Sequence, residues 1–184
     1  SLMKPLGMHV ETVPLEEAGG RITASPLASK VDDPRFDNSA MDGFAVIASD
    51  CQVTGTTLRI IGTSQAGSEL SLRIREGQAC RIMTGAPLPE GSDAIVMIED
   101  TVVNGEQVII NGPARTGFIR KRAENLSMGQ VALPSGTLLT SASLALAGTM
   151  GHGSLEVIKR PRIAVISTGD ELVQPGYELA PGQI

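Results

Sequence analysis

The chain has 184 residues and a formal net charge of −5, and its 41% hydrophobic and 19% charged residues are typical of a soluble globular protein of one or two domains. The acidic balance and the few aromatic residues (Phe 3, Tyr 1, Trp 0) argue against a nucleic-acid binder, which needs a basic surface and stacking rings. No stretch reaches the roughly 18 apolar residues of a membrane span, and the two cysteines indicate neither a zinc site nor a disulfide framework, which favours a protein of the reducing cytoplasm without membrane contact.

Short strands and turns are predicted for most of the chain, because glycine and proline are abundant (Gly 21, Pro 11). Residues 10–15 and 22–27 are apolar runs around the sequence EEAGG, which predicts a strand, a single helical turn and a second strand. Between residues 31 and 129, short apolar runs alternate with turn residues, and we expect a compact β domain. The clearest of these runs are residues 58–61, 79–82 and 94–98.

Two further elements are predicted from turn and capping residues. Residues 102–110 contain an Asn-Gly dipeptide between apolar runs, which is typical of a tight β-hairpin. Residues 140–151 have the best helical pattern; Thr140 or Ser141 can cap this helix and Gly151 can end it. The residues expected on its apolar face are Leu144, Ala147 and Met150.

The end of the chain predicts the start of another domain. A short strand is expected at residues 155–158, and residues 163–166 then form a continuous apolar run, typical of a strand buried on both faces of a parallel sheet. Such a strand needs neighbours joined by crossover helices, and Pro175 and Pro181 prevent a long helix in the residues that follow. We therefore expect only the first strand of a truncated α/β domain.

The first candidate site lies within residues 37–46, where polar side chains precede an apolar strand. Asp42 and the following glycine form a turn dipeptide, so the polar cluster is presented at the end of a rigid element. One interpretation is that Asp42, with Asp37 and Ser39, binds a metal ion or a polar ligand. The alternative is ordinary turn chemistry before a strand, which needs no ligand.

The second candidate site follows the predicted strand 79–82. Thr84 offers a hydroxyl, and an open N–H of Gly85 would suit an oxyanion or a phosphate. A strand-ending turn is the alternative. The motif is not a Walker loop, because no Gly-Lys-Ser/Thr sequence follows.

Two charged segments complete the candidates. Asp170 and Glu171 follow the predicted parallel strand, where ligands of open α/β sheets bind, and adjacent carboxylates could hold Mg²⁺; the alternative is capping of a helix start. The basic run of Arg120, Lys121 and Arg122 is either a solvated surface or a phosphate clamp.

Four motifs, in this order, closely resemble those of the MoeA family, the molybdopterin molybdenumtransferases, which include the E domain of gephyrin. They are residues 20–22 (GRI), 36–43 (FDNSAMDG), 81–89 (RIMTGAPLP) and 167–172 (STGDEL), and together they extend over nearly the whole chain. The resemblance implies an enzyme of molybdenum cofactor biosynthesis. This enzyme inserts molybdate into adenylylated molybdopterin with Mg²⁺ and releases AMP.

The resemblance also implies roles for particular residues. A bridging divalent cation would reconcile acidic side chains with anionic substrates. By similarity, the catalytic residues are Asp42, Thr84 and Glu171, and Asp42 and Glu171 are also the candidate Mg²⁺ ligands. The expected substrate-binding residues are Ser39, Gly85, Arg120, Arg122 and Asp170.

The fold implied is mixed α/β and mostly β. A β-barrel-like domain (29–129) would be inserted in an elongated α+β dimerisation domain (1–28 and 130–157), followed by the start of a truncated molybdopterin-binding domain (158–184). The family implies a homodimer whose active cleft lies between the α/β domain and the partner's β domain. Molybdopterin adenylyltransferase and molybdoenzyme maturation proteins are further expected partners.

Two departures from the family pattern bear on function. Ala123 stands where the family usually has Gly, which removes backbone freedom at this position. Asn125 stands where the family usually has Asp, and the lost negative charge argues against a metal or acid role for this residue. The remaining motifs of the α/β domain lie beyond residue 184, so we expect the chain alone to be inactive. The alternative function is a non-catalytic scaffold or partner-binding module. A hydrolase based on Asp42 lacks an activated nucleophile.

Overall fold

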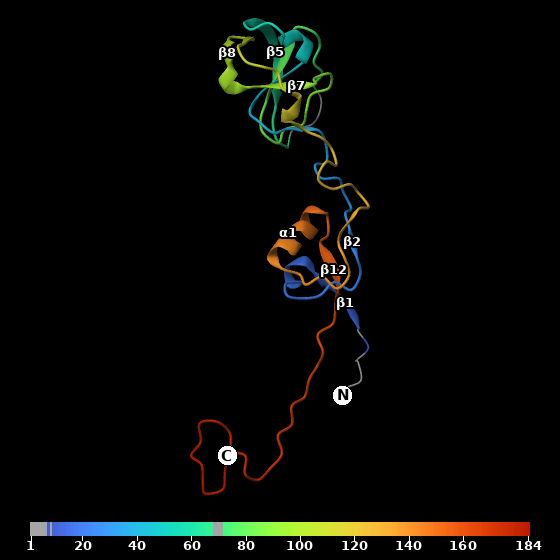
Figure 1. Cartoon of the computed structure of the whole chain (residues 1–184), viewed down its shortest axis with the longest axis vertical. Coiled ribbons are helices and arrows are strands. Elements are labelled where there is room, and N and C mark those ends of the chain that lie inside the picture. Colours follow the sequence, from blue (N-terminus) through green and yellow to red (C-terminus); the bar gives the residue numbers. More distant parts are fainter. Residues whose placement is uncertain (1–6, 8, 68–71) are drawn as a thin grey trace.

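The computed structural model describes residues 7, 9–67 and 72–184, so part of the expected first domain lies outside the described residues. The molecule is elongated, with two lobes joined by two chain segments that run side by side, and a C-terminal segment that leads away from the second lobe (Figure 1). Among the described residues one α-helix and many short strands occur, which confirms the prediction of a mostly β fold. No helix in the described part has the length and apolarity needed to cross a bilayer.

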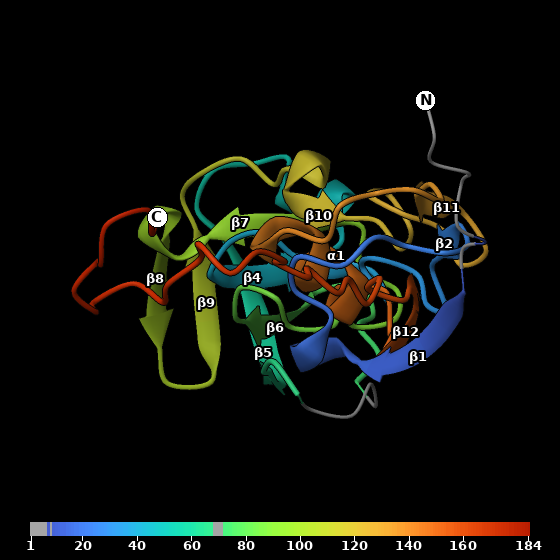
Figure 2. The ribbon, with the colours of Figure 1, turned by 90° about the horizontal axis from the view of Figure 1, so that it is seen from below.

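The first lobe is built on a curled six-stranded sheet, whose β8–β9 hairpin lies at one edge (Figure 2). Neighbouring strands are antiparallel except β5 and β6, which are parallel. The predicted Asn-Gly hairpin is confirmed, with Gly105 at φ 58° in the turn. In spatial order the strands are β7 (Ala94–Met97), β4 (Gly43–Val46), β6 (Gln78–Ile82), β5 (Thr56–Ser64), β9 (Gln107–Ile110) and β8 (Thr101–Asn104).

Strand β4 is buried on both faces, because a hydrophobic cluster covers each side of the sheet. Side chains of a strand alternate between faces. Phe44 and Val46 accordingly pack in one cluster with Leu58 and Val96, while Ala45 packs in the other with Ile82. The strand is thereby fixed in register, and the residue just before it is held at a defined place.

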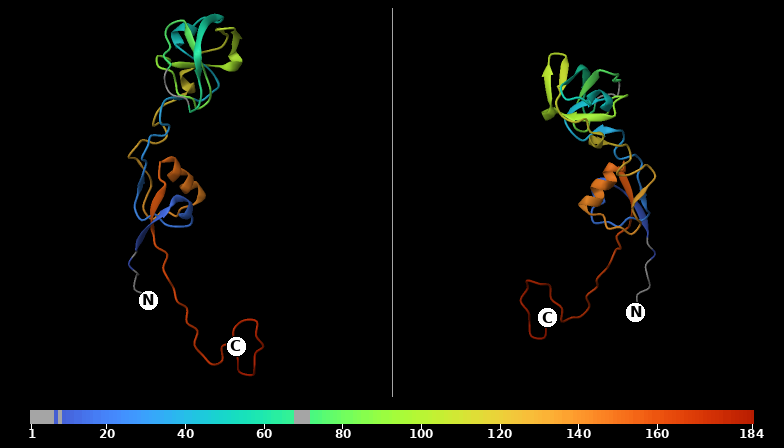
Figure 3. Two further views of the ribbon diagram at one scale, coloured as in Figure 1. Left: turned by 180° about the vertical axis from the view of Figure 1, so that it is seen from behind. Right: turned by 45° about the horizontal axis from the view of Figure 1, so that its top comes forward.

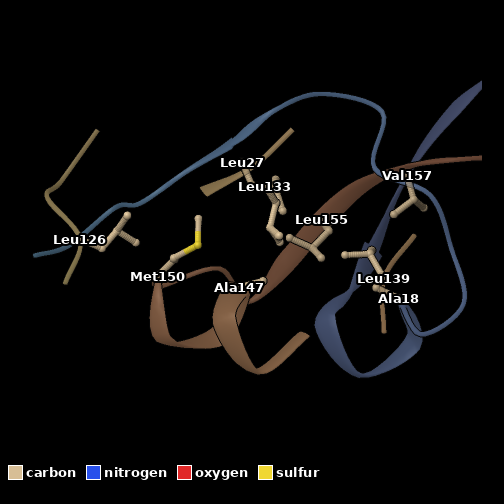
Figure 4. Packing of buried hydrophobic residues seen from close by; sticks show 9 residues of the cluster. All are labelled: Ala18, Leu27, Leu126, Leu133, Leu139, Ala147, Met150, Leu155 and Val157. Carbon is tan, nitrogen blue, oxygen red and sulfur yellow. The ribbon is translucent and has the colours of Figure 1, made fainter. Parts of the chain in front are cut away.

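The second lobe packs a helix against two short antiparallel ladders (Figure 4). The ladders join β1 (Val10–Pro14) to β12 (Ser154–Ile158) and β2 (Leu27–Ala28) to β11 (Val131–Leu133). The predicted single helical turn is the 3-10 turn η1 (Leu15–Glu17). The shared core consists of Ala18, Leu27, Leu126, Leu133, Leu139, Ala147, Met150, Leu155 and Val157.

The predicted helix is confirmed as α1 (Ser141–Thr149). The Thr140 side chain accepts a hydrogen bond from the N–H of Ser143, which satisfies one of the free donors at the helix start. Gly151 follows at φ 87°, a conformation that favours glycine. Ala147 and Met150 are fully buried, as the pattern predicted.

The two segments between the lobes form a connector, which we define as residues 29–37 and 119–130. Where it meets the first lobe, β10 (Ile119–Arg120) forms a ladder with β3 (Asn38–Ser39), which directly follows residue 37. Three single turns, η2 (Ala48–Cys51), η3 (Ile98–Asp100) and η4 (Thr116–Phe118), complete the regular structure.

The predicted strand at residues 163–166 is wrong. These residues have no regular structure, and the side chains of Ile163, Val165 and Ile166 are 79%, 88% and 81% exposed. A strand must pair its N–H and C=O groups with a neighbour. None of the described residues pairs with this run, so apolarity alone does not make it a strand.

Candidate functional site

Asp42 lies immediately before β4, and its backbone is fixed from both sides. The N–H of Ile98 donates to the Asp42 carbonyl at 3.1 Å. A Cβ on Gly43 would lie 2.0 Å from the carbonyl oxygen of Val96, so only glycine lets β4 approach β7 this closely. The glycine that follows Asp42 therefore does more than form a turn: it seats the aspartate against the neighbouring strand.

Thr84 holds the Asp42 side chain. Both its backbone N–H and its hydroxyl donate to Oδ1 of Asp42, at 2.7 and 2.9 Å, although 42 positions separate the two residues. The N–H bond is the main reason that the pKa of Asp42 lies below its ordinary value, the hydroxyl bond adds to this, and the positive charge of Arg81 lowers the pKa further. The structure thus brings two of the predicted site residues together at an exposed end of the sheet, with the carboxylate ionised.

Ser39 and Gly85 build the turns that carry this pair. The sequence predicts an open N–H at Gly85, and this prediction is wrong. The N–H donates to the Ser39 carbonyl at 2.8 Å, so it cannot also bind an oxyanion. Ser39 is fully buried, and its hydroxyl exchanges hydrogen bonds with the backbone of Met41. Ser39 and Gly85 therefore fix the backbone around the Asp42–Thr84 pair. The Ser39 hydroxyl and the Gly85 N–H are both used in these bonds and are not free for a ligand.

Asp37 and the basic run pair with each other. The Asp37 carboxylate accepts from Nζ of Lys121 at 2.9 Å and from the N–H of Arg122 at 2.8 Å. Partial burial acts to raise its pKa, but these two hydrogen bonds outweigh that effect and the pKa is lowered. The Asp37 carboxylate is therefore used in hydrogen bonds within the connector. The predicted role of Asp37 beside Asp42 in binding a ligand is not supported.

The two candidate arginines of the basic run differ. Nε of Arg122 donates to Oδ2 of Asp32 at 2.6 Å, so this side chain is already paired. Arg120 is exposed and has no side-chain partner among the described residues, and it is the member of the run that remains free for a ligand.

The departures from the family pattern lie beside this run. Nδ2 of Asn125 donates to Asp33 at 3.1 Å, so the amide forms a hydrogen bond that a carboxylate could not donate. Ala123 has φ 62°, and among the described residues no other non-glycine residue has a positive φ. Asn125 thus bonds within the connector, whereas Ala123 is held there in a conformation that favours glycine.

Asp170 and Glu171 lie in the exposed C-terminal segment, on the far side of the second lobe from the six-stranded sheet (Figure 3). The structure does not bring them to Asp42 within one chain. The alternative role in capping a helix is not observed either, since the described residues 172–184 contain no helix.

A magnesium site at Asp42 would use few protein ligands. Among the described residues, no three His, Cys, Asp or Glu side chains gather into a possible metal cage. Mg²⁺ usually keeps several waters and is bound through one or two carboxylates and substrate phosphates. Asp42 is exposed and ionised, and its Oδ2 accepts no hydrogen bond from the described residues, so it fits such a site as one of its protein ligands.

Arg81 is a neighbour of the site that sequence reasoning missed. It faces Phe44 across the β4–β6 ladder, and its charge acts on Asp42. The available signal was a charged residue inside the otherwise apolar strand at 79–82.

Comparisons with known proteins agree with this architecture. Residues 2–151 match the family model of the MoeA N-terminal region, domains I and II. The molybdopterin molybdenumtransferase of Haemophilus influenzae is 40% identical over 182 residues, which are 98% of this chain and 45% of the relative; molybdopterin molybdenumtransferase 2 of Mycobacterium tuberculosis is 41% identical over 94% of this chain and 44% of the relative.

A solved structure gives the same result. The molybdopterin biosynthesis MoeA protein of Pyrococcus horikoshii OT3 superimposes with a TM-score of 0.85 at 31% identity, over 92% of this chain and 46% of that protein. The chain thus spans less than half the length of these relatives. It belongs to the MoeA family, whose N-terminal region it matches.

Proposed function

We propose that the protein to which this chain belongs inserts molybdate into adenylylated molybdopterin and releases AMP, as a step of molybdenum cofactor biosynthesis. The names of the relatives support a transferase acting on molybdopterin. The observation that carries the proposal is the exposed Asp42–Thr84 pair, in which one carboxylate oxygen is fixed and the other is free for a ligand.

The anionic substrates explain why an acidic residue needs a cation. Asp42 alone would repel molybdate and phosphate. We propose that Asp42 and Glu171 hold Mg²⁺, which would neutralise charge between the carboxylates and the substrate oxygens. Thr84 fixes the carboxylate orientation, and Arg120 and Asp170 are the further proposed substrate contacts.

The separation of Glu171 from Asp42 supports an active site shared between subunits. We propose a homodimer in which residues 1–28 and 130–157 form the dimerisation domain and residues 29–129 form the inserted domain. In that arrangement the first lobe of one protomer meets the α/β domain of its partner, of which residues 158–184 are the start. We further propose a cytoplasmic location and contacts with molybdopterin adenylyltransferase and with molybdoenzyme maturation proteins.

The test is Asp42→Asn in the whole protein, with Glu106→Gln, an exposed carboxylate of the β8–β9 turn, as the control. We expect Asp42→Asn to abolish cofactor maturation, measured as molybdoenzyme activity in cells that lack the native protein, while the mass of the dimer stays unchanged. Unchanged maturation would contradict the proposal and favour the scaffold function, for which the loss of the family acid at Asn125 is the supporting observation.

A further inference from the structure

The pairing of the strands places a guanidinium beside Asp42. Residues directly opposite each other on paired strands have Cβ atoms about 5 Å apart. Phe44 faces Arg81 across the β4–β6 ladder, and Asp42 is two residues before Phe44. Asp42 lies in the bend just before β4, and Thr84, which bonds its carboxylate, lies three residues after Arg81, so Asp42 and Arg81 are neighbours at the end of the sheet at which β4 begins.

Arg81 has no ion-pair partner within the part of the chain that the structure describes. It is partly exposed. Thr84, and not a cationic side chain, makes both hydrogen bonds to Asp42. These two bonds are the main causes of the lowered pKa of Asp42, and the charge of Arg81 adds a smaller effect without a bond. This end of the sheet thus presents a free carboxylate oxygen and a guanidinium without an ion pair among the described residues.

We propose that Arg81 is a substrate-binding residue, which binds an anionic oxygen of a tetrahedral oxyanion whose counter-cation is held by Asp42. The planar fork of arginine matches phosphate and similar oxyanions and stays charged at any working pH. A carboxylate and a neighbouring guanidinium recognise a cation–oxyanion pair, whereas either group alone recognises only half of it. This inference rests on the proposed function, and the oxyanion is either the phosphate of the nucleotide or molybdate itself.

The probes are AMP and molybdate, each titrated with Mg²⁺ into the ¹⁵N-labelled 184-residue chain. The amide resonances of Thr84 and Gly85 report on the site. We expect Arg81→Gln to weaken the apparent affinity for one anion about tenfold, the effect of a lost charge-assisted hydrogen bond. Arg81→Lys keeps the charge without the fork and should be intermediate. The anion whose affinity falls identifies the bound oxyanion.

Two controls separate the inference from a structural role and from the proposed function. Arg59→Gln removes another arginine of the same sheet that has no ion pair among the described residues, and it should bind both anions normally. Unshifted resonances elsewhere show that Arg81→Gln is folded. If Arg81→Gln binds both anions normally while Asp42→Asn loses the Mg²⁺ dependence, the inference is wrong and the proposed function stands. If Asp42→Asn changes nothing, both are overturned. If the unaltered chain shows no Mg²⁺-dependent shift, the inference is wrong, and the proposed function is decided by Asp42→Asn in the whole protein.

Discussion

The Asp42 carboxylate is positioned by a neutral residue, and this can be measured directly. In Thr84→Val the hydroxyl bond to Oδ1 is lost, but the backbone N–H bond, which has the larger effect on the pKa, remains. We expect the pKa of Asp42 to rise part of the way to its ordinary value of 3.8. Carbon-13 NMR titration of the Asp42 carboxyl measures this, and Thr56→Val is a matched control whose hydroxyl bonds Val53 instead.

The same shift gives a pH dependence of stability. Because the folded pKa of Asp42 is lower than the unfolded one, its ionisation stabilises the fold above pH 3.8, and this contribution is lost as the pH falls through the folded pKa. In Thr84→Val the folded pKa of Asp42 should lie closer to 3.8, so stability should depend on pH over a narrower range below pH 3.8. An Asp42 pKa that is the same in both proteins would contradict the role given to the hydroxyl.

Ala123 is a strained residue, and glycine should relieve it. A left-handed conformation destabilises the folded state of a residue with a Cβ by about 1–2 kcal/mol. Glycine removes this strain, but its greater conformational entropy in the unfolded chain offsets part of the stabilisation. We expect Ala123→Gly to raise the free energy of unfolding by about 0.5 kcal/mol. Urea denaturation measures it. In Ala66→Gly, at an exposed turn residue with an ordinary φ, the free energy should fall instead, and a fall in both variants would contradict the argument.

At the scale of residues, the sequence identifies which side chains matter better than it identifies their partners. Asp42 and Thr84 stand out in their motifs, but only the pairing of β4 with β6 brings them together. The Gly85 N–H and the Asp37 carboxylate look free in the sequence, and both are taken by groups distant along the chain. Free donors and acceptors are a property of the fold and not of a motif.

At the scale of elements, the contact of β4 with β7 depends on Gly43. We expect Gly43→Ala to lower the free energy of unfolding by about 3 kcal/mol, because the added Cβ meets a backbone carbonyl that cannot rotate away. Gly117→Ala is the control, since a Cβ there meets open space and the φ is not positive. Thermal and urea unfolding measure both. A neutral Gly43→Ala would show that the two strands can separate at no cost.

Local signals predicted the elements that depend on local chemistry. The cap at Thr140 and the turn at Gly105 satisfy or bend the backbone within a few residues, so helix α1 and the β8–β9 hairpin were found from the sequence. The parallel pairing of β5 with β6 and the order of the sheet have no such signal. Residues 163–166 carry the composition of a buried strand, but their structure depends on neighbours and not on composition.

At the scale of the whole molecule, the relative orientation of the two lobes depends on the connector. Asp32 accepts from Arg122 and from the N–H of Met128 at 2.8 Å, and Asp37 accepts from Lys121 and the N–H of Arg122. One exposed ion pair contributes little, about 0–1 kcal/mol. These two carboxylates, however, tie the outgoing segment to the returning one at several points, and they bond backbone groups as well as charges.

We therefore expect Asp32→Asn combined with Asp37→Asn to leave both lobes folded but to free their relative orientation. Residual dipolar couplings measure this, because a rigid molecule fits one alignment tensor and mobile lobes need two. Hydrogen exchange at the N–H groups of Arg122 and Met128 should also become faster. The pKa values of both aspartates are lowered. The hydrogen bonds of Asp32 and Asp37 in the unaltered connector should therefore persist down to pH 3.8 and be lost as the pH falls through the folded pKa values.

The control for the connector is Glu76→Gln combined with Glu106→Gln, two exposed carboxylates of the first lobe that lie outside the connector. This double variant removes the same amount of negative charge as the aspartate variant, and its residual dipolar couplings should still fit a single alignment tensor. A single tensor in the aspartate variant as well would mean that the β2–β11 and β3–β10 ladders alone hold the lobes in place. The proposed active site shared between subunits needs the first lobe to reach its partner at a fixed angle, so a mobile connector should also weaken any activity that depends on Asp42.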